Sequence, residues 1–171
     1  GPSRGRGAWG GPRWRFPAHG VAGFGAAGDS GARTPAEAAK SAAIVVSVVV
    51  NAAQTETILF GAGGVAETLA KGAVFVSSAT MDPDVARRLA KQLEATGRHY
   101  LDAPISGGAQ RAAQGELIIL ASGSPAAFAK ARPARDSLAA KPYALRDAAG
   151  PGPGFNIATP LPARVPIPPA P

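Results

Sequence analysis

Cysteine is absent from the sequence, which excludes disulfide bonds and thiolate metal sites. A cysteine-free chain is compatible with a reducing compartment, and we expect a cytoplasmic protein. No apolar run reaches the roughly 18 residues that a membrane-spanning helix needs, so we expect no membrane partner. Residues 1–30 are rich in Gly and Arg and lack the apolar stretch of a secretory signal.

Proline is scarce in the middle of the chain and abundant at its end. Of the 17 prolines, only Pro83, Pro104 and Pro125 fall within residues 41–127, whereas eight fall within residues 151–171. A proline destabilises a helix interior by roughly 3 kcal/mol. The last twenty residues should therefore not form a continuous helix.

Acidic residues are few at both ends, so the positive charge lies there. The net charge is +7, with +4 on residues 1–40, −1 on residues 41–127 and +4 on residues 128–171. A nucleic-acid-binding domain needs a basic face on the folded part, which the neutral middle does not offer. We expect no nucleic acid partner. The alternative is an Arg- and Gly-rich tail in which Arg and Trp of residues 1–20 stack on bases and contact phosphates.

The neutral middle alternates between strand-like and helix-like patterns. The first strand-like run, Ile44–Val50, is nearly all β-branched and reads as a strand buried on both faces. Three further runs have the composition of strands: residues 73–79, 98–104 and 116–122. Strands that alternate with helices indicate an α/β fold with a mainly parallel sheet.

Two of the intervening segments carry helix-start motifs. In the first, Thr34 is the predicted N-cap, Pro35 the first helical residue and Glu37 the partner that completes a capping box. In the second, Asp82 and Pro83 repeat the pattern, Gly97 is the predicted end, and one apolar face is formed by Val85, Leu89 and Leu93.

Small and polar residues follow three of the predicted strands. They are residues 51–54, 77–80 and 102–108. In open α/β sheets, ligands bind beyond the carboxyl ends of the strands, where these segments should meet. The alternative is that they are ordinary loops, because strand-to-helix connections are usually small and polar.

The third of these segments resembles a known family. Its pattern is an Asp, a small residue, Pro, an aliphatic residue, Ser, two glycines and a downstream Gly, here Asp102, Ala103, Pro104, Ile105, Ser106, Gly107, Gly108 and Gly115. This resembles the substrate-binding segment of the β-hydroxyacid dehydrogenases, which include 3-hydroxyisobutyrate, tartronate semialdehyde and L-threonate dehydrogenases. Residues 45–61 most resemble the L-threonate dehydrogenase branch, and the resemblance extends over residues 34–134.

The resemblance implies a Rossmann-like fold, doubly wound but incomplete, and an NAD(P)-dependent oxidoreductase acting on a small hydroxy acid such as L-threonate or 3-hydroxyisobutyrate. The cofactor would be NAD or NADP, and no metal is implied. Ser106, Gly107 and Gly108 would hold the substrate carboxylate through hydroxyl and backbone N–H groups. Asn51 and Thr80 would lie beside the nicotinamide. A glycine-rich turn without a ligand is the alternative interpretation.

The N-terminal segment departs from the family pattern. Gly5, Gly7 and Gly10 formally match the G-x-G-x-x-G dinucleotide fingerprint and are the candidate cofactor-binding glycines. No apolar strand precedes them, although the fingerprint depends on a strand that delivers the turn to a helix N-terminus. Pro12 and Pro17 make the following segment a poor helix. No acidic residue that would bind the adenine ribose is identifiable, so NAD and NADP are not distinguished.

The C-terminal segment departs further. Residues 147–165 resemble the start of the family's interdomain helix, with Asn156 at the position of the catalytic lysine. Pro160 and Pro162 then interrupt that helix. An amide cannot supply the proton that an ammonium group gives as a general acid, so we expect Asn156 to be inactive. We expect no oligomer, because the helical domain that pairs subunits in the family has no counterpart in the sequence.

These observations divide the chain into three expected zones. Residues 1–33 would be a poorly ordered, degenerate start of the dinucleotide-binding domain, residues 34–134 its Rossmann-like core, and residues 135–171 a proline-rich remnant of the interdomain helix. A natural truncation, a degraded gene product and a shifted reading frame are all compatible with this division. The functional alternatives are an enzyme fragment lacking full activity, a non-catalytic dinucleotide-binding module and the nucleic-acid-binding tail.

Overall fold

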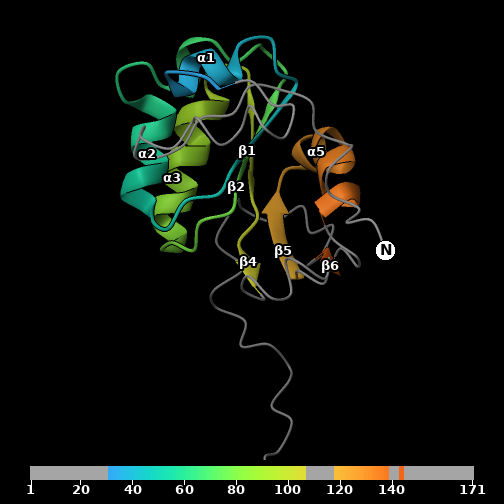
Figure 1. Cartoon of the computed structure of the whole chain (residues 1–171). Coiled ribbons are helices and arrows are strands. Elements are labelled where there is room, and N and C mark those ends of the chain that lie inside the picture. Colours follow the sequence, from blue (N-terminus) through green and yellow to red (C-terminus); the bar gives the residue numbers. More distant parts are fainter. Residues whose placement is uncertain (1–30, 107–117, 139–142, 145–171) are drawn as a thin grey trace, which may run out of the picture.

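The computed structural model describes residues 31–106, 118–138 and 143–144 (Figure 1). Most of the expected zones 1–33 and 135–171 therefore lies outside the described residues. In the described ranges, no helix has both the length and the apolar composition that crossing a bilayer requires. The elements in chain order are α1 (Pro35–Ala39), β1 (Ile44–Ser47), α2 (Ala52–Phe60), the 3₁₀ helix η3 (Val65–Glu67), β2 (Val74–Ser77), α3 (Pro83–Glu94), β3 (His99–Asp102), β4 (Ile105–Ser106), β5 (Ile118–Gly123), α5 (Pro125–Leu138) and β6 (Tyr143–Ala144).

The strands form one sheet in the order β1-β2-β3-β5-β4, with β6 paired to β5. Neighbours among β1, β2 and β3 run parallel, whereas β5 runs antiparallel to both β3 and β4. The prediction of an α/β, Rossmann-like fold with a mainly parallel sheet is confirmed. The fourth predicted strand, now β5, runs against the direction of the first three, and β6 runs parallel to β5.

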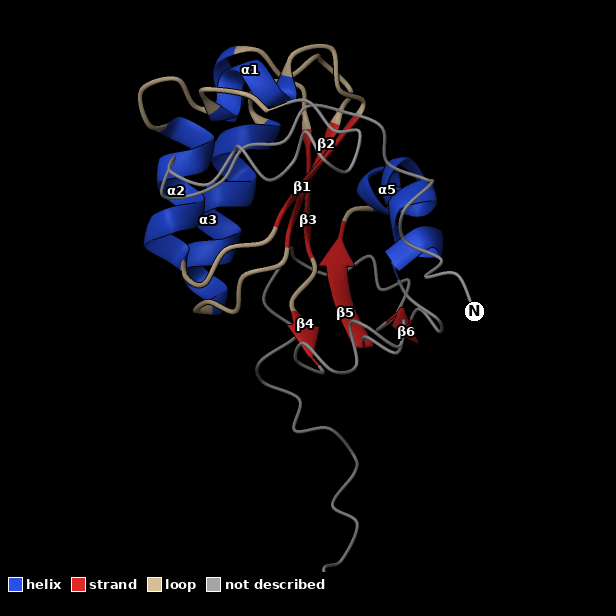
Figure 2. Cartoon of the chain, in the orientation of Figure 1, coloured by secondary structure: helices blue, strands red, loops and turns tan. Residues whose placement is uncertain are grey.

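Helices cover both faces of this sheet (Figure 2), with α2 and α3 on one face and α5 on the other. Side chains alternate between the faces along each strand, so neighbouring residues enter different cores. Phe75 and Tyr100 pack under the first pair of helices with Leu89 and Leu93 of α3. A second core lies on the other face. The strands contribute Val74, Val76 and Leu101 to it, and α5 contributes the small residues Ala127 and Ala131.

The predicted helix starts are confirmed in atomic detail. The Thr34 hydroxyl accepts a hydrogen bond from the Glu37 backbone N–H at 3.1 Å, and the Asp82 carboxylate accepts one from the Asp84 N–H at 2.8 Å. The Glu37 carboxylate accepts from the Arg33 N–H, one residue before the cap, rather than from the cap itself. Thr34 and Asp82 thus satisfy backbone donors that a helix leaves unpaired at its first turn. The prediction that Glu37 completes a capping box is wrong, because its carboxylate bonds to the N–H before the cap.

The first predicted strand is shorter and less buried than its composition indicated. The strand β1 ends at Ser47, and its first three residues are only partly buried. Val48 and Val50 are 71% and 79% exposed. The prediction of a strand buried on both faces through Val50 is therefore wrong. Strand β1 lies at one end of the described sheet, and the chain must leave the sheet after Ser47 to place Asn51 as the N-cap of α2.

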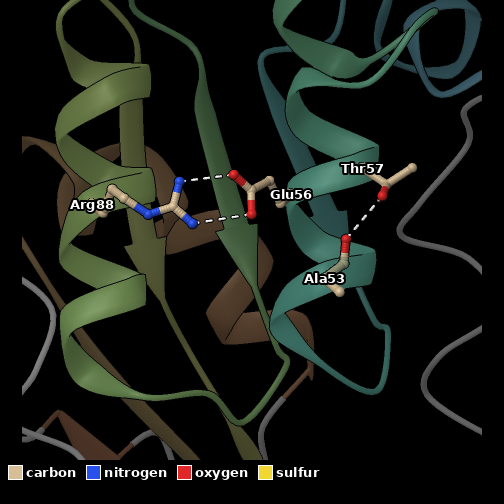
Figure 3. Close-up of polar contacts among 4 residues, drawn as sticks. All are labelled: Ala53, Glu56, Thr57 and Arg88. Atoms are coloured by element: carbon tan, nitrogen blue, oxygen red, sulfur yellow. Dashed lines mark hydrogen bonds and ion pairs between the residues drawn. The ribbon is translucent and has the colours of Figure 1, made fainter.

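An ion pair joins the two helices on one face of the sheet. Both guanidinium nitrogens of Arg88 in α3 donate to the Glu56 carboxylate in α2, at 2.8 and 3.0 Å (Figure 3). The hydrogen bond from Arg88 lowers the pKa of the Glu56 carboxyl below its ordinary value of 4.5. The pair is exposed, so its effect on stability is small and screened by salt.

We therefore expect Arg88→Ala to lower the urea midpoint of unfolding slightly at about pH 7. A lowered folded-state pKa stabilises the fold above the ordinary pKa, and that stabilisation is lost as pH falls through the lowered value. The difference between Arg88→Ala and the original chain should thus shrink as pH falls below 4.5, and also at about 1 M salt. Arg87→Ala is the matched control, since Arg87 pairs with Asp84 within α3. A difference that persists unchanged in acid would contradict this account.

Candidate functional site

The strands β1, β2 and β3 end at the same register position of the sheet. Ser47 is the register partner of Ser77, and Ser77 of Asp102. The next backbone N–H groups continue the ladder: Ser78 donates to the Ser47 carbonyl at 2.9 Å and Ala103 to the Ser77 carbonyl at 2.7 Å. Three segments therefore leave the sheet from one edge, as the sequence predicted.

Asn51 lies on the first of these segments and is exposed. Its side-chain oxygen accepts from the Gln54 N–H at 3.0 Å, and the Gln54 side-chain oxygen accepts from the Val50 N–H at 3.0 Å. The two side chains fix the backbone that enters α2. Among the described residues, the Asn51 amide NH₂ group has no hydrogen-bond partner and can donate to a ligand.

Thr80 lies on the second segment, between β2 and α3, and its side chain is exposed. Its neighbours Ala79 and Met81 are both buried in the core beneath α3. The buried neighbours anchor the backbone on either side of Thr80, so the hydroxyl is presented outward from a fixed position. This placement agrees with the predicted position beside a ligand at the strand ends.

Ser106 lies on the third segment, but in a short strand rather than in the predicted turn. It belongs to β4, where Ile105 pairs with Ile119 and Ser106 with Ile118 of β5. Ile105 packs against the core on the α5 side, whereas Ser106 is exposed. Figure 2 shows β4 beyond the ends of β1–β3, at the edge from which the loops run to α2 and α3. The structure therefore brings Asn51, Thr80 and Ser106 to one edge of the sheet.

The remaining predicted site residues lie outside the described residues. They are the substrate-binding candidates Gly107 and Gly108, the cofactor-binding candidates Gly5, Gly7 and Gly10, and Asn156 at the family lysine position. Their assignments stay predictions.

Two exposed valines complete the edge, and sequence reasoning missed them. Val48 and Val50 immediately precede Asn51 and present apolar side chains to solvent. An apolar surface beside a few convergent polar groups is typical of a ligand site. The sign in the sequence was the Asn N-cap at residue 51, because a helix that starts there leaves its preceding residues outside the sheet.

The edge offers few titrating groups. Asp82 and Asp102 are the only ionisable residues within 47–51, 77–82 and 102–106, and the Asp82 carboxylate caps α3. Burial raises the pKa of the Tyr100 phenol, and the Asp102 charge raises it further, while the nearby Ser77 hydroxyl opposes the rise. Tyr100 is thus neutral at physiological pH. Within the part of the chain that the structure describes, no group of His, Cys, Asp and Glu residues could hold a metal ion.

The described part of this edge carries groups suited to binding. It presents an amide, hydroxyl groups and apolar surface, all of which suit a ligand with a flat apolar face and polar substituents.

Comparison with known proteins agrees with this geometry. The model of the family described as the NAD binding domain of 6-phosphogluconate dehydrogenase matches residues 17–146. An L-threonate dehydrogenase of Cupriavidus necator is 40% identical over 144 residues, which are 84% of this chain and 48% of that protein. The chain thus spans about half the length of this curated relative.

Solved structures give the same result. The crystal structure of a 3-hydroxyisobutyrate dehydrogenase from Salmonella typhimurium matches with a TM-score of 0.77 and 34% identity, over 89% of this chain and 54% of that one. An imine reductase from Myxococcus stipitatus in complex with NADP+ matches with a TM-score of 0.67 and 25% identity, over 77% and 45% of the two chains. Because the family match extends over most of its length, the chain belongs to the NAD-binding domain family of 6-phosphogluconate dehydrogenase, with L-threonate and 3-hydroxyisobutyrate dehydrogenases among its relatives.

Proposed function

We propose that the chain is the NAD(P)-binding part of an oxidoreductase that acts on a small hydroxy acid such as L-threonate or 3-hydroxyisobutyrate. The observation that carries the proposal is the shared edge at which Asn51, Thr80 and Ser106 are exposed beyond β1–β3. The relatives named above are dehydrogenases for those two hydroxy acids. A cytoplasmic location and the use of NAD or of NADP belong to the same proposal.

Each group at the edge has a role that follows from its chemistry. Val48 and Val50 would cover one face of a nicotinamide ring, because both expose apolar surface at the start of the α2 loop. Asn51 and Thr80 would hydrogen-bond its carboxamide, and Ser106 would donate to the substrate carboxylate. The bound cofactor would accept a hydride from the hydroxyl-bearing carbon of the substrate.

Within this proposal the 171-residue chain binds but does not turn over substrate. Asn156 stands where the family has its lysine, and an amide cannot act as the general acid. A dinucleotide-binding module without catalysis is therefore the second candidate function. The nucleic-acid alternative depends on residues 1–20, which lie outside the described residues.

Calorimetric titration with NADH and NADPH tests the binding role. We expect affinity weaker than micromolar, because Pro12 and Pro17 disfavour the helix that should follow the candidate turn at Gly5–Gly10 and receive the pyrophosphate. Thr80→Ala should weaken binding by about threefold to tenfold, the usual effect of losing one hydrogen bond to a ligand. Thr57→Ala should leave the affinity unchanged, because this exposed α2 threonine bonds only within its own helix, to the Ala53 carbonyl at 2.9 Å (Figure 3).

Equal losses for Thr80→Ala and Thr57→Ala would contradict the placement of the cofactor at this edge. Micromolar or tighter binding by the original chain would show instead that Gly5–Gly10 is supported as a phosphate-binding turn. Far-ultraviolet circular dichroism of each variant would check that the fold is intact in both cases.

A further inference from the structure

A row of polar residues crosses the sheet just inside the carboxyl edge. Register pairs Ser47 with Ser77, Ser77 with Asp102, and Asp102 with Ser122. These four residues, which we call the polar row, are 6%, 0%, 6% and 8% exposed in that order. Each comes from a different strand, so the row is built only when β1, β2, β3 and β5 are assembled.

The polar row lies on the face that α2 and α3 cover. Ser77 and Asp102 are two residues after Phe75 and Tyr100, and residues two apart in a strand share a face. Phe75 and Tyr100 both belong to the core beneath those helices. The Tyr100 hydroxyl reaches the same region, since Ser77 and Asp102 both influence its pKa. The polar row is therefore buried between the sheet and the helices, and it is not part of the exposed binding edge.

Several hydroxyls of this region have no hydrogen-bond partner among the described residues. The side-chain oxygens of Ser47, Ser77, Tyr100 and Ser122 are buried and form no hydrogen bond to the residues that the structure describes. Buried polar groups are almost always hydrogen-bonded, to protein or to ordered water, because an unpaired one loses its hydration without compensation. Four such hydroxyls on neighbouring strands, in a row with one carboxylate, require an explanation.

The polar row carries smaller side chains than the neighbouring row of the sheet. One step further into the sheet, the register row on the same face is Val45, Phe75 and Tyr100, whose side chains are large. Serine replaces valine and phenylalanine in the polar row, so less volume is occupied next to the same helices. A polar, roomy position with two to four polar partners is where buried water is found.

We propose that the polar row is an internal hydration site, in which bound water links the hydroxyls of Ser47, Ser77, Tyr100 and Ser122 to the Asp102 carboxylate. The carboxylate only accepts hydrogen bonds, whereas water both donates and accepts, so water can connect it to several hydroxyls at once. The hydrated row holds the three points at which the chain leaves β1, β2 and β3. Ser47, Ser77 and Asp102 are thus positioning residues for the loops that carry Asn51, Thr80 and Ser106.

Alanine substitution in the full chain distinguishes a hydrated row from a dry one. If water is bound, Ser77→Ala removes a partner and should lower the folding equilibrium constant about fivefold or more. If the row is dry, the same change removes an unpaired buried hydroxyl and should raise that constant, which would overturn the proposal. Ser78→Ala is the matched control: it is the next residue, half-buried and on the other face, and should change the constant less than about twofold.

Loop positioning has its own readout in amide hydrogen exchange. In Ser77→Ala, the amides of Ser78 and Ala103 should exchange faster, because their acceptors are the carbonyls of Ser47 and Ser77. The amide of Gly72 donates to the Gly97 carbonyl at the opposite edge. Its exchange rate should change only as much as the global loss of stability requires. Uniform acceleration of all three amides would overturn the positioning role.

A measurement on the original chain covers the case in which Ser77→Ala does not fold. Water-to-protein nuclear Overhauser effects should connect long-lived water to the ring protons of Tyr100 and the β-protons of Ser77 and Ser122. The absence of these effects, in a chain whose other core resonances are assigned, would overturn the proposal. The test needs neither cofactor nor turnover, so its outcome is independent of the proposed function.

Discussion

Phe75→Ala is expected to lower the free energy of unfolding by about 3–5 kcal/mol, the usual cost of emptying a large aromatic site in a core. Phe75 lies in β2 between β1 and β3, and none of its side chain is exposed. Its ring stacks on Tyr100 with centroids 5.9 Å apart and an angle of 27° between the planes. The change therefore removes both buried area and an aromatic contact, and urea unfolding measures the loss.

Val48→Ala is the control for Phe75→Ala. Val48 is also a large apolar residue near a strand of the same sheet, but 71% of it is exposed. Its replacement should change the free energy of unfolding by no more than about 0.5 kcal/mol. Losses of similar size for the two variants would mean that β2 is not the centre of the core.

No steady dehydrogenase turnover is expected from the chain with L-threonate, 3-hydroxyisobutyrate or D-glycerate. General acid–base help is worth roughly two to four orders of magnitude in rate, and the family resemblance predicts Asn156 at the position of the lysine that would supply it. Asn156→Lys alone should not restore activity, because Pro160 and Pro162 in the sequence would interrupt a helix that orients the lysine. The assay follows the absorbance of the reduced nicotinamide.

Turnover of any of these acids by the purified chain would contradict this prediction, provided that Ser106→Ala abolishes it. The Ser106 condition separates activity at the proposed site from a contaminating enzyme. Ser106 is suited to this control because it is exposed in β4, so that its replacement leaves the core intact.

Local sequence rules predicted much of the fold. Thr34 and Asp82 cap helices as expected, because capping depends on residues only two or three positions apart. The buried face of α3 also follows from local spacing, with Leu89 and Leu93 fully buried. The end of β1 was wrong because composition alone cannot tell a strand from an apolar segment that leaves the sheet. The end of β1 is decided by its place in the sheet and by the helix cap at Asn51.

The candidate site was predicted in part. Asn51, Thr80 and Ser106 share an edge because parallel strands end together, which the alternation of strands and helices implies. The polar row was not predicted, since pairing Asp102 with Ser77 and Ser122 depends on the register of strands far apart in sequence. The strand segments ending in Ser47, Ser77 and Asp102 did carry a sign of it, a polar residue after three mostly apolar ones.

The central claim is tested most directly by titrating the isotope-labelled chain with NADH and measuring the amide resonances by nuclear magnetic resonance. We predict that the amides of Asn51 and Thr80 shift, with saturation only well above micromolar concentration. Ser41 and Lys71, which line a cavity of about 200 Å³ at the opposite edge of the sheet, should not shift. Unchanged resonances of Asn51 and Thr80, or shifts confined to Ser41 and Lys71, would contradict a cofactor site at the carboxyl ends of β1–β3.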